Sequence, residues 1–314
     1  MRVLVTGAAG FIGSHVAERL ADSGHDVVGI DDLSTGEIGN VPVGIEFEEA
    51  SILDEVRLAA AIGGADSVVH LAARPSVPRS IEEPMRSHHA NATGTLNVLQ
   101  AARRLDHPHV IVASSSSVYG ANPTLPKHEE LAAQPLSPYA VSKLAAEQYA
   151  LAWQQSYGVG TLAFRFFNVY GPRQAPGHAY AAVIPAFVHA ALAGEPLTIH
   201  GDGTQSRDFT YVGTVTDVIT SAVESRTTCP SPVNLAFGTR TTLLEMIGTL
   251  GSVLGRPLER NHVNPRAGDV AHSQADNSLL RSLVPDVQPV ELADGLRRTI
   301  DWMTTAWAPT TLPS

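Results

Sequence analysis

Residues 3–17 read VLVTGAAGFIGSHVA, an aliphatic run followed by three spaced glycines and a helical pattern. A run without polar alternation is typical of a strand buried on both faces of a parallel sheet. Gly7 permits a tight turn, Gly10 leaves the backbone open to a ligand, and Gly13 permits close packing of the helix that follows. Because the first N–H groups of a helix are unpaired and its dipole is positive there, this segment predicts a pyrophosphate site.

A second aliphatic run, DVVGI at residues 26–30, ends at Asp31. This acid follows the glycines by about twenty residues, the distance at which a dinucleotide site places a carboxylate against the adenosine ribose. A carboxylate accepts hydrogen bonds from both ribose hydroxyls and repels a 2′-phosphate. We therefore predict NAD rather than NADP as the cofactor.

Strand-like and helical patterns alternate from residue 1 to about residue 165, which predicts an α/β fold, a Rossmann-type doubly wound parallel sheet. The expected strands cover residues 2–6, 26–31, 45–48, 67–71, 109–114 and 160–165, and the expected helices cover 11–23, 54–62, 84–105 and 137–157.

Beyond residue 165, proline and glycine punctuate short elements, which is typical of a loop-rich lobe. We expect an NAD-binding domain over 1–165 and a smaller α/β substrate lobe over 166–306, interleaved with a last strand or two of the main sheet. Residues 307–314 are expected to form a loose tail.

The chain has 314 residues and a net charge of −10, which argues against a surface that binds nucleic acid or an anionic membrane. Its single cysteine, Cys229, suits a reducing compartment. No apolar run approaches the roughly 18 residues of a membrane span, and an expected strand at residue 2 leaves no room for a signal peptide. The predicted location is therefore cytoplasmic.

The chemistry is indicated by Tyr139 and Lys143, which lie 24 residues beyond Ser115 in a serine run at 114–117. Positions i and i+4 of a helix share a face, so the ammonium can lie below the tyrosine ring. A free tyrosine, with a pKa near 10, is a poor base at neutral pH. We expect the ammonium and the charge of NAD⁺ to lower the pKa of Tyr139, so that it acts as a general base.

The Gly-x-x-Gly-x-x-Gly spacing and the Tyr-x-x-x-Lys pair resemble the extended branch of the short-chain dehydrogenase/reductase superfamily, whose members act largely on nucleotide sugars. Family members usually have an aspartate against adenine where this chain has Ser51, and a hydroxyl can still form a hydrogen bond there. Asn91 is expected to support the active-site backbone, and His70 to be structural. The cofactor-binding residues that the resemblance implies are Gly7, Gly10, Phe11, Ile12, Gly13, Asp31, Asp32, Ser51, Ile52, Leu71, Ala72, Ala73, Asn91, Tyr139, Lys143 and Phe166.

The serine run indicates which reaction is expected. Related dehydratases and decarboxylases have acids just after the catalytic hydroxyl, whereas this chain has Ser116 and Ser117. The pattern resembles UDP-hexose 4-epimerases, in which NAD⁺ oxidises C4 and the hydride returns to the opposite face. The resemblance implies Tyr139 as base, Lys143 tuning it, and Ser115 with Ser116 on the C4 oxygen. Another nucleotide-sugar enzyme of this branch, such as a dehydratase, a decarboxylase or a 4-ketoreductase, and a catalytically silent NAD-sensing scaffold remain open.

The resemblance also implies a UDP-sugar site without a metal, and a homodimer formed through the helices at 84–105 and 137–157. The expected residues of the sugar site are Ser115, Ser117, Arg74, Asn168, Arg173, Ala182, Val183, Thr198, Arg207, Arg266 and Asp269. Of these, Arg207 and Arg266 are expected to bind the diphosphate, and Asp269 a ribose. Ala175 stands where uronate-specific relatives have an arginine, which leaves Arg74 and Arg173 as candidate partners of a sugar carboxylate. We therefore place UDP-glucose and UDP-galactose ahead of the UDP-uronates, and the N-acetylated sugars third.

Overall fold

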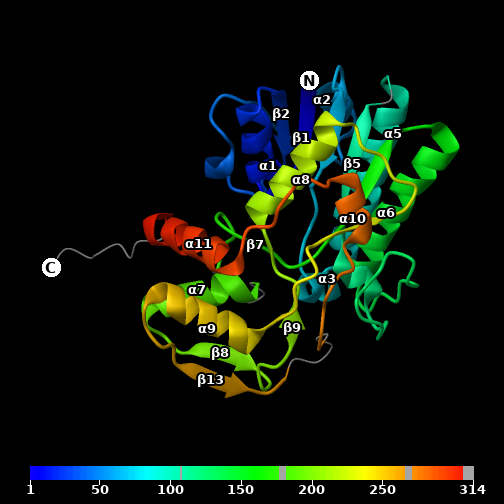
Figure 1. Ribbon diagram of the computed structural model, residues 1–314. Helices are drawn as coiled ribbons and strands as arrows, with labels where there is room; N and C mark the ends of the chain where they lie inside the picture. Colours follow the sequence, from blue (N-terminus) through cyan, green and yellow to red (C-terminus); the bar gives the residue numbers. More distant parts are fainter. Residues whose placement is uncertain (107, 177–181, 266–270, 307–314) are drawn as a thin grey trace.

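The computed structural model describes residues 1–106, 108–176, 182–265 and 271–306. Within these ranges the largest sheet has seven parallel strands, in the order β11-β6-β5-β4-β1-β2-β3 (Figure 1). They are β1 (Arg2–Thr6), β2 (Asp26–Asp31), β3 (Glu46–Glu49), β4 (Ser67–His70), β5 (His109–Ser115), β6 (Thr161–Phe166) and β11 (Val233–Leu235). The doubly wound parallel sheet expected from the sequence is confirmed, and a strand from the second half of the chain joins it.

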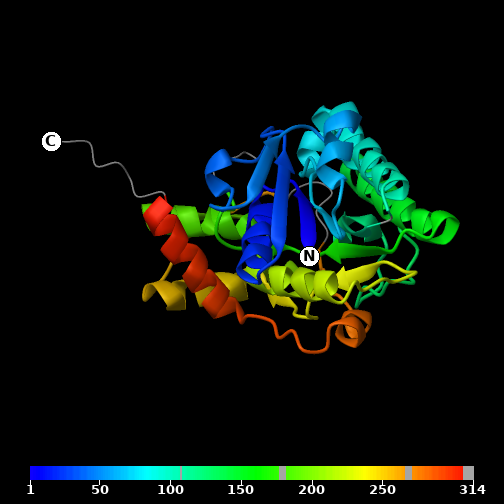
Figure 2. The same cartoon turned by 90° about the horizontal axis from the view of Figure 1, so that it is seen from above.

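Helices cover both faces of this sheet, as Figure 2 shows from above. On one face, α1 (Phe11–Asp22) and α8 (Val212–Glu224) pack against each other and enclose an apolar core that includes Val3, Val5 and Ile111. On the other face, α2 (Glu55–Ile62), α5 (Gly94–Arg104) and α6 (Pro138–Tyr157) enclose a second core. Because both faces of the inner strands are buried, β1 and β2 are largely apolar, whereas β3 at the edge of the sheet reads Glu-Phe-Glu-Glu.

The single helix expected over 84–105 is interrupted. It consists of α4 (Pro84–His88), a π-helical turn at His89–Thr93, and α5, and a further helix, α3 (Val77–Glu82), precedes it. At this turn the Thr95 hydroxyl donates to the Asn91 carbonyl over 2.6 Å. Such π turns are frequently found at functional sites, and this one holds the predicted Asn91.

A smaller lobe is formed by α7 (Val183–Ala193), α9 (Leu243–Leu254), α11 (Leu292–Ala306) and a parallel pair of strands, β8 (Leu197–His200) and β13 (Arg260–Val263). These elements share an apolar core of their own and lie together in the lower part of Figure 1. Two short strand pairs are formed by segments that lie, in sequence, between elements of the large sheet and elements of this lobe. They are β7 (Val169–Tyr170) with β10 (Thr210–Tyr211), and β9 (Ser206–Arg207) with β12 (Thr241–Thr242).

The chain passes back and forth between the two parts. After β8 and β10 in the lobe region it returns to the large sheet for α8 and β11, and then enters the lobe again at α9. A short helix, α10 (Ser278–Leu283), contacts β11 before the chain ends the described region in α11. Among the described helices, none combines the length and apolar character needed to span a bilayer.

Candidate active site

The glycine turn between β1 and α1 brings three backbone segments close together. Gly7 has φ +75°, and a Cβ there would lie 2.7 Å from the Ala72 nitrogen. A Cβ at Gly13 would lie 1.9 Å from the Gly7 carbonyl oxygen, so only glycine lets α1 approach the turn. Gly10 precedes the helix without a side-chain cap. The first turn of α1 thus offers its N–H groups and the positive end of its dipole to an anion, which fits a dinucleotide pyrophosphate.

Asp31, at the carboxyl end of β2, is connected to the glycine turn. Its two carboxylate oxygens accept hydrogen bonds from the N–H groups of Ala9 (3.0 Å) and Leu33 (2.9 Å). Burial raises the pKa of the Asp31 carboxyl, and these backbone bonds oppose the rise. The carboxylate keeps lone pairs for ribose hydroxyls. Asp32, by contrast, accepts both the N–H and the hydroxyl of Ser34.

The adenosine side of the predicted site includes Ser51 and Ile52, which follow β3. The Ser51 hydroxyl accepts the Leu53 N–H over 3.3 Å, and Ile52 is buried against Gly94, where a Cβ would lie 2.3 Å from its Cδ1. Next to the turn, Glu37 donates its N–H to the Ala9 carbonyl over 3.0 Å. Residues 33–40 thus fold against the glycine turn.

His70, at the end of β4, is buried between two threonines, and the hydrogen bonds define its tautomer. Because the Thr95 hydroxyl donates to the Asn91 carbonyl, it accepts from His70 Nε2 (3.0 Å). His70 Nδ1 then accepts from Thr6 (2.7 Å), whose oxygen accepts the Ala72 N–H (3.1 Å). Burial lowers the pKa of His70 to about 3, so the ring stays neutral. This chain of bonds fixes the backbone of Ala72 beside the glycine turn, as a structural histidine would.

Asn91 connects the same region to α6. Its side chain accepts the Arg74 N–H over 2.7 Å, donates to the Arg74 carbonyl over 3.2 Å and donates to the Ser142 hydroxyl over 2.9 Å. Leu71, Ala72 and Ala73 lie between the two anchors formed by His70 and Asn91. The small side chains after Leu71 therefore stay in a fixed position at the carboxyl edge of the sheet.

Tyr139 and Lys143 lie in the first turns of α6, which begins where the Ser137 hydroxyl accepts the Ala140 N–H and Pro138 fixes the first helical residue. The N–H of Tyr139 donates to the Ser80 hydroxyl of α3 over 3.0 Å. Lys143 is buried, and its ammonium donates to the Ala113 carbonyl of β5 over 2.9 Å. Burial lowers the pKa of Lys143 to about 8.

The Ser115 side chain acts on Tyr139 in the direction that lowers the pKa of the phenol, as a hydrogen-bonding neighbour does. The Ser115 oxygen also accepts the N–H of Ser117 (3.2 Å) and the hydroxyl of Ser117 (2.9 Å). Because both of these bonds use its lone pairs, Ser115 has its own proton to donate to the tyrosine oxygen, which favours the phenolate.

In the protein without its cofactor the pKa of Tyr139 is raised, so the Lys143 ammonium alone does not produce the lowering that was expected from the ammonium and NAD⁺ together. Burial is the larger effect and outweighs the opposing effect of Ser115. The same burial that lowers the pKa of Lys143 disfavours the charged form of both groups. The protein alone therefore favours the protonated form of Tyr139, and the positive charge of NAD⁺ remains the other expected effect that can lower its pKa.

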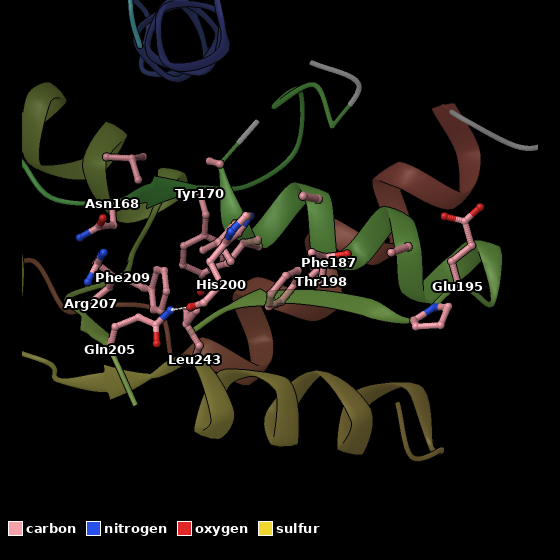
Figure 3. Close-up of a pocket in the computed structure, with 17 residues that line it drawn as sticks. Asn168, Tyr170, Phe187, Glu195, Thr198, His200, Gln205, Arg207, Phe209 and Leu243 are labelled. Carbon is pink, nitrogen blue, oxygen red and sulfur yellow. Dashed lines mark hydrogen bonds between the residues drawn. The ribbon is translucent and has the colours of Figure 1, made fainter. Parts of the chain in front are cut away.

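A cavity of about 510 Å³ lies in the smaller lobe next to the end of β6 (Figure 3). Ser115 is the register partner of Phe166, and Asn168 follows two residues later, so the catalytic serines and the cavity share one edge. Asn168 and Arg207 lie at one end of the cavity and Glu195 at the other. The described lining residues are Asn168, Val169, Tyr170, Ala182, Val183, Ile184, Ala186, Phe187, Ala190, Glu195, Pro196, Thr198, His200, Gln205, Arg207, Phe209 and Leu243.

A family model, described as the NAD dependent epimerase/dehydratase family, matches residues 3–236, a range that includes the glycine turn, the Tyr139–Lys143 pair and the Asn168 end of the cavity. The chain belongs to this family. A UDP-glucose 4-epimerase of Mycolicibacterium smegmatis is 37% identical over 309 residues, covering 96% of this chain and 98% of that protein.

Solved structures of the epimerase/dehydratase family give the same result. A UDP-N-acetylglucosamine 4-epimerase from Methanobrevibacter ruminantium, in complex with UDP-N-acetylmuramic acid, has a TM-score of 0.92 at 36% identity and covers 97% of this chain and 98% of that chain. A Thermus thermophilus UDP-glucose 4-epimerase in complex with NAD has a TM-score of 0.87 at 35% identity, covering 98% and 100%. The cofactor of the family is NAD, as the glycine turn and Asp31 predict.

The named activities differ among family members. A "Probable UDP-glucuronate 4-epimerase" of Rhizobium meliloti is 34% identical to this chain, with 96% of each protein covered. An NDP-hexosamine 5,6-dehydratase, TunA, is 32% identical, with a TM-score of 0.86 and coverage of 97% and 98%. The chain is therefore a nucleotide-sugar enzyme of the epimerase/dehydratase family, and its sugar is a separate question.

Not all of the predicted substrate residues converge in this member of the family. Asn168, Ala182, Val183, Thr198 and Arg207 line the cavity. Arg74 instead forms an ion pair with Glu83, and Arg173 places one guanidinium nitrogen 2.9 Å from both oxygens of Glu18 on α1. Ser115 and Ser117 lie at the end of β5 and in the 3-10 turn that follows it. Arg266 and Asp269 lie outside the described residues.

Three residues next to the catalytic set were not predicted from the sequence. Glu147 on α6, Ser114 on β5 and Arg165 on β6 form a buried polar network beneath Ser115. One signal was present, because Glu147 follows Lys143 by four residues and so extends the row that begins at Tyr139. The partners of Glu147 come from two distant strands, and the helical spacing does not reveal them.

Proposed function

We propose that the protein is an NAD-dependent 4-epimerase of UDP-hexoses. The proposal rests on the Ser115–Tyr139–Lys143 set and on the two residues that follow Ser115. These are Ser116 and Ser117, so the serine run provides hydroxyl groups and no carboxylic acid. Such a set can move a proton at one sugar oxygen. It has no acid at these positions to protonate a leaving hydroxyl, which the loss of water in a dehydratase requires.

In this proposal Tyr139 accepts the proton of the sugar C4 hydroxyl. The single Ser115 hydroxyl proton is donated either to the Tyr139 oxygen or to the C4 oxygen as the reaction proceeds. Lys143 stays fixed to the Ala113 carbonyl and contributes its positive charge below the ring. Bound NAD supplies the hydride acceptor for C4 and the donor for its return. Inversion requires the 4-keto sugar to present its other face while UDP stays anchored, and the cavity with Arg207 and Asn168 supports such an anchor.

The ion pairs of the arginines support a neutral C6 group. A sugar carboxylate that is buried without a cation is costly, by several kcal/mol. Both cations considered for that role already have glutamate partners, since Arg74 pairs with Glu83 and Arg173 pairs with Glu18. UDP-glucose and UDP-galactose therefore remain ahead of UDP-glucuronate and UDP-galacturonate in the proposal, and the N-acetylated pair stays third.

The test is to incubate the purified enzyme separately with UDP-glucose, UDP-glucuronate and UDP-N-acetylglucosamine and to resolve the C4 epimers. We expect the highest kcat/KM for UDP-glucose, with no net NADH released because the hydride leaves and returns in one turnover. A tenfold preference for the uronate would contradict the proposed sugar. Stoichiometric NADH would instead indicate a reductase or dehydrogenase, and absence of turnover on all UDP-sugars would indicate a silent NAD-binding protein.

An Arg207→Ala substitution is expected to raise KM for the UDP-sugar about 10- to 100-fold, because a charge-assisted hydrogen bond to phosphate contributes roughly 1.5–3 kcal/mol. We also expect free 4-keto sugar to escape during turnover, which can be trapped with borohydride. Arg297→Ala on α11 is the matched control, since that side chain is half exposed and pairs with Asp294. An unchanged KM would remove Arg207 from the diphosphate site.

A further inference from the structure

Glu147 and Arg165 form a buried ion pair directly beneath the catalytic serines. The side chains are 0% and 4% exposed, and two parallel bonds join them, from Arg165 Nη2 to Glu147 Oε1 (2.7 Å) and from Nε to Oε2 (2.9 Å). The Ser114 hydroxyl donates to the same Oε2 over 2.7 Å. We name these three residues the Ser114–Glu147–Arg165 network. It connects β6 to α6 and β5, the two elements that hold Tyr139, Lys143 and Ser115.

The network continues a row of contacts between α6 and β5. Tyr139, Lys143 and Glu147 follow one another at intervals of four and so lie on one face of the helix. Two of them form hydrogen bonds to consecutive residues of β5, because Lys143 donates to the Ala113 carbonyl and Glu147 accepts from the Ser114 hydroxyl. The next residue of the strand, Ser115, is the one that acts on Tyr139. A rotation of α6 that breaks the Ser114–Glu147 bond would therefore also move Tyr139 relative to Ser115.

Arg165 extends this support to the turn that holds Ser116 and Ser117. Its guanidinium carbon lies 4.7 Å from the centre of the Tyr119 ring, and Tyr119 ends this 3-10 turn. Ser114 is the register partner of Arg165, and Ser115 is that of Phe166. The Tyr119 hydroxyl donates to Asn234 of β11 over 2.7 Å, which fixes the other end of the ring.

We propose that Glu147 is a positioning residue for the reaction, which sets the distance between Tyr139 and Ser115 through Ser114 while Arg165 neutralises its charge. The assignment to a reaction rests on the proposed epimerase function. The geometric part does not, since it states only that the Ser114–Glu147 bond keeps α6, and with it Tyr139, in a fixed position relative to Ser115. The Ser115 side chain lowers the pKa of Tyr139, so a displacement of Tyr139 from Ser115 would raise that pKa further.

A Ser114→Ala variant tests this inference, since it removes the link to β5 and leaves the Glu147–Arg165 pair intact. The matched control is Thr161→Val, which deletes another buried hydroxyl that connects the sheet to α6, through the Ala150 carbonyl (3.0 Å), far from the catalytic end. We expect Ser114→Ala to lower kcat about tenfold with KM nearly unchanged, because small displacements of a catalytic group cost this much or more. The acidic limb of its kcat–pH profile should shift to higher pH, whereas Thr161→Val should change only Tm.

A second measurement follows Tyr139 itself without any substrate. In protein labelled with ¹³C-tyrosine, the Tyr139 signal is the one lost in Tyr139→Phe, and its titration should move to higher pH in Ser114→Ala and in Glu147→Gln if the latter folds. Equal kcat, pH profile and titration in Ser114→Ala and Thr161→Val would overturn the inference and leave the network a purely structural feature. If the native protein turned over no UDP-sugar but the titration still moved, the proposed function would be wrong and the positioning role would stand.

Discussion

A Tyr139→Phe variant is expected to retain NAD and to bind UDP-sugar while its kcat falls about 10²–10⁴-fold, the usual contribution of a general base. The substitution removes the phenol oxygen that is to accept the proton. It leaves the ring, the Ser80 contact to the Tyr139 N–H and the Lys143–Ala113 bond in place. Steady-state kinetics and separate titrations of NAD and UDP-sugar measure the two effects.

The matched control for this experiment is Tyr149→Phe, which alters an exposed tyrosine on the same helix. It should leave kcat and both affinities unchanged. If Tyr139→Phe retained a rate near that of the native enzyme, the base would have to be a serine or water, and the proposed mechanism would be wrong.

A Gly13→Ala variant is expected to weaken NAD binding about 10- to 100-fold, because the new methyl carbon would lie 1.9 Å from the Gly7 carbonyl oxygen. The obstructing atom belongs to the backbone, so α1 or the glycine turn must move, and overpacking of this kind costs about 1–3 kcal/mol. Calorimetric titration with NAD gives the affinity, and circular dichroism establishes that the variant is folded.

Gly248→Ala on α9 serves as the control for this substitution, because a Cβ at Gly248 meets nothing within 4 Å. This second variant should bind NAD as the native protein does. Equal NAD affinity in Gly13→Ala and the native protein would mean that the first turn of α1 does not hold the dinucleotide.

The parts of the site that follow a local period were predictable from the sequence. A strand, three glycines and an acid at the end of the next strand gave the turn at Gly7 and the position of Asp31, and helical spacing placed Tyr139 and Lys143 on one face. The π turn at Asn91 was not predictable, because the residues around it remain compatible with a continuous helix.

Contacts between distant parts of the chain also could not be predicted from the sequence. Nothing near Arg173 indicates that Glu18, 155 residues earlier, accepts its guanidinium, and the partner of Arg165 lies on a different element. The raised pKa of Tyr139 in the protein without NAD⁺ could not be predicted for the same reason. The sequence shows which charges are near in a helix, whereas the depth of burial depends on the whole fold.

The repeated passage of the chain between the large sheet and the smaller lobe limits how such an enzyme can be recombined. The lobe is not a terminal cassette, since α8 and β11 of the sheet are encoded between its β8 and α9. A chimera that borrows the sugar cavity of a relative would need at least two exchanged segments, one on each side of α8 and β11. A chain cut after β6 would lose β11 and expose a row of unpaired backbone groups along the edge of β6.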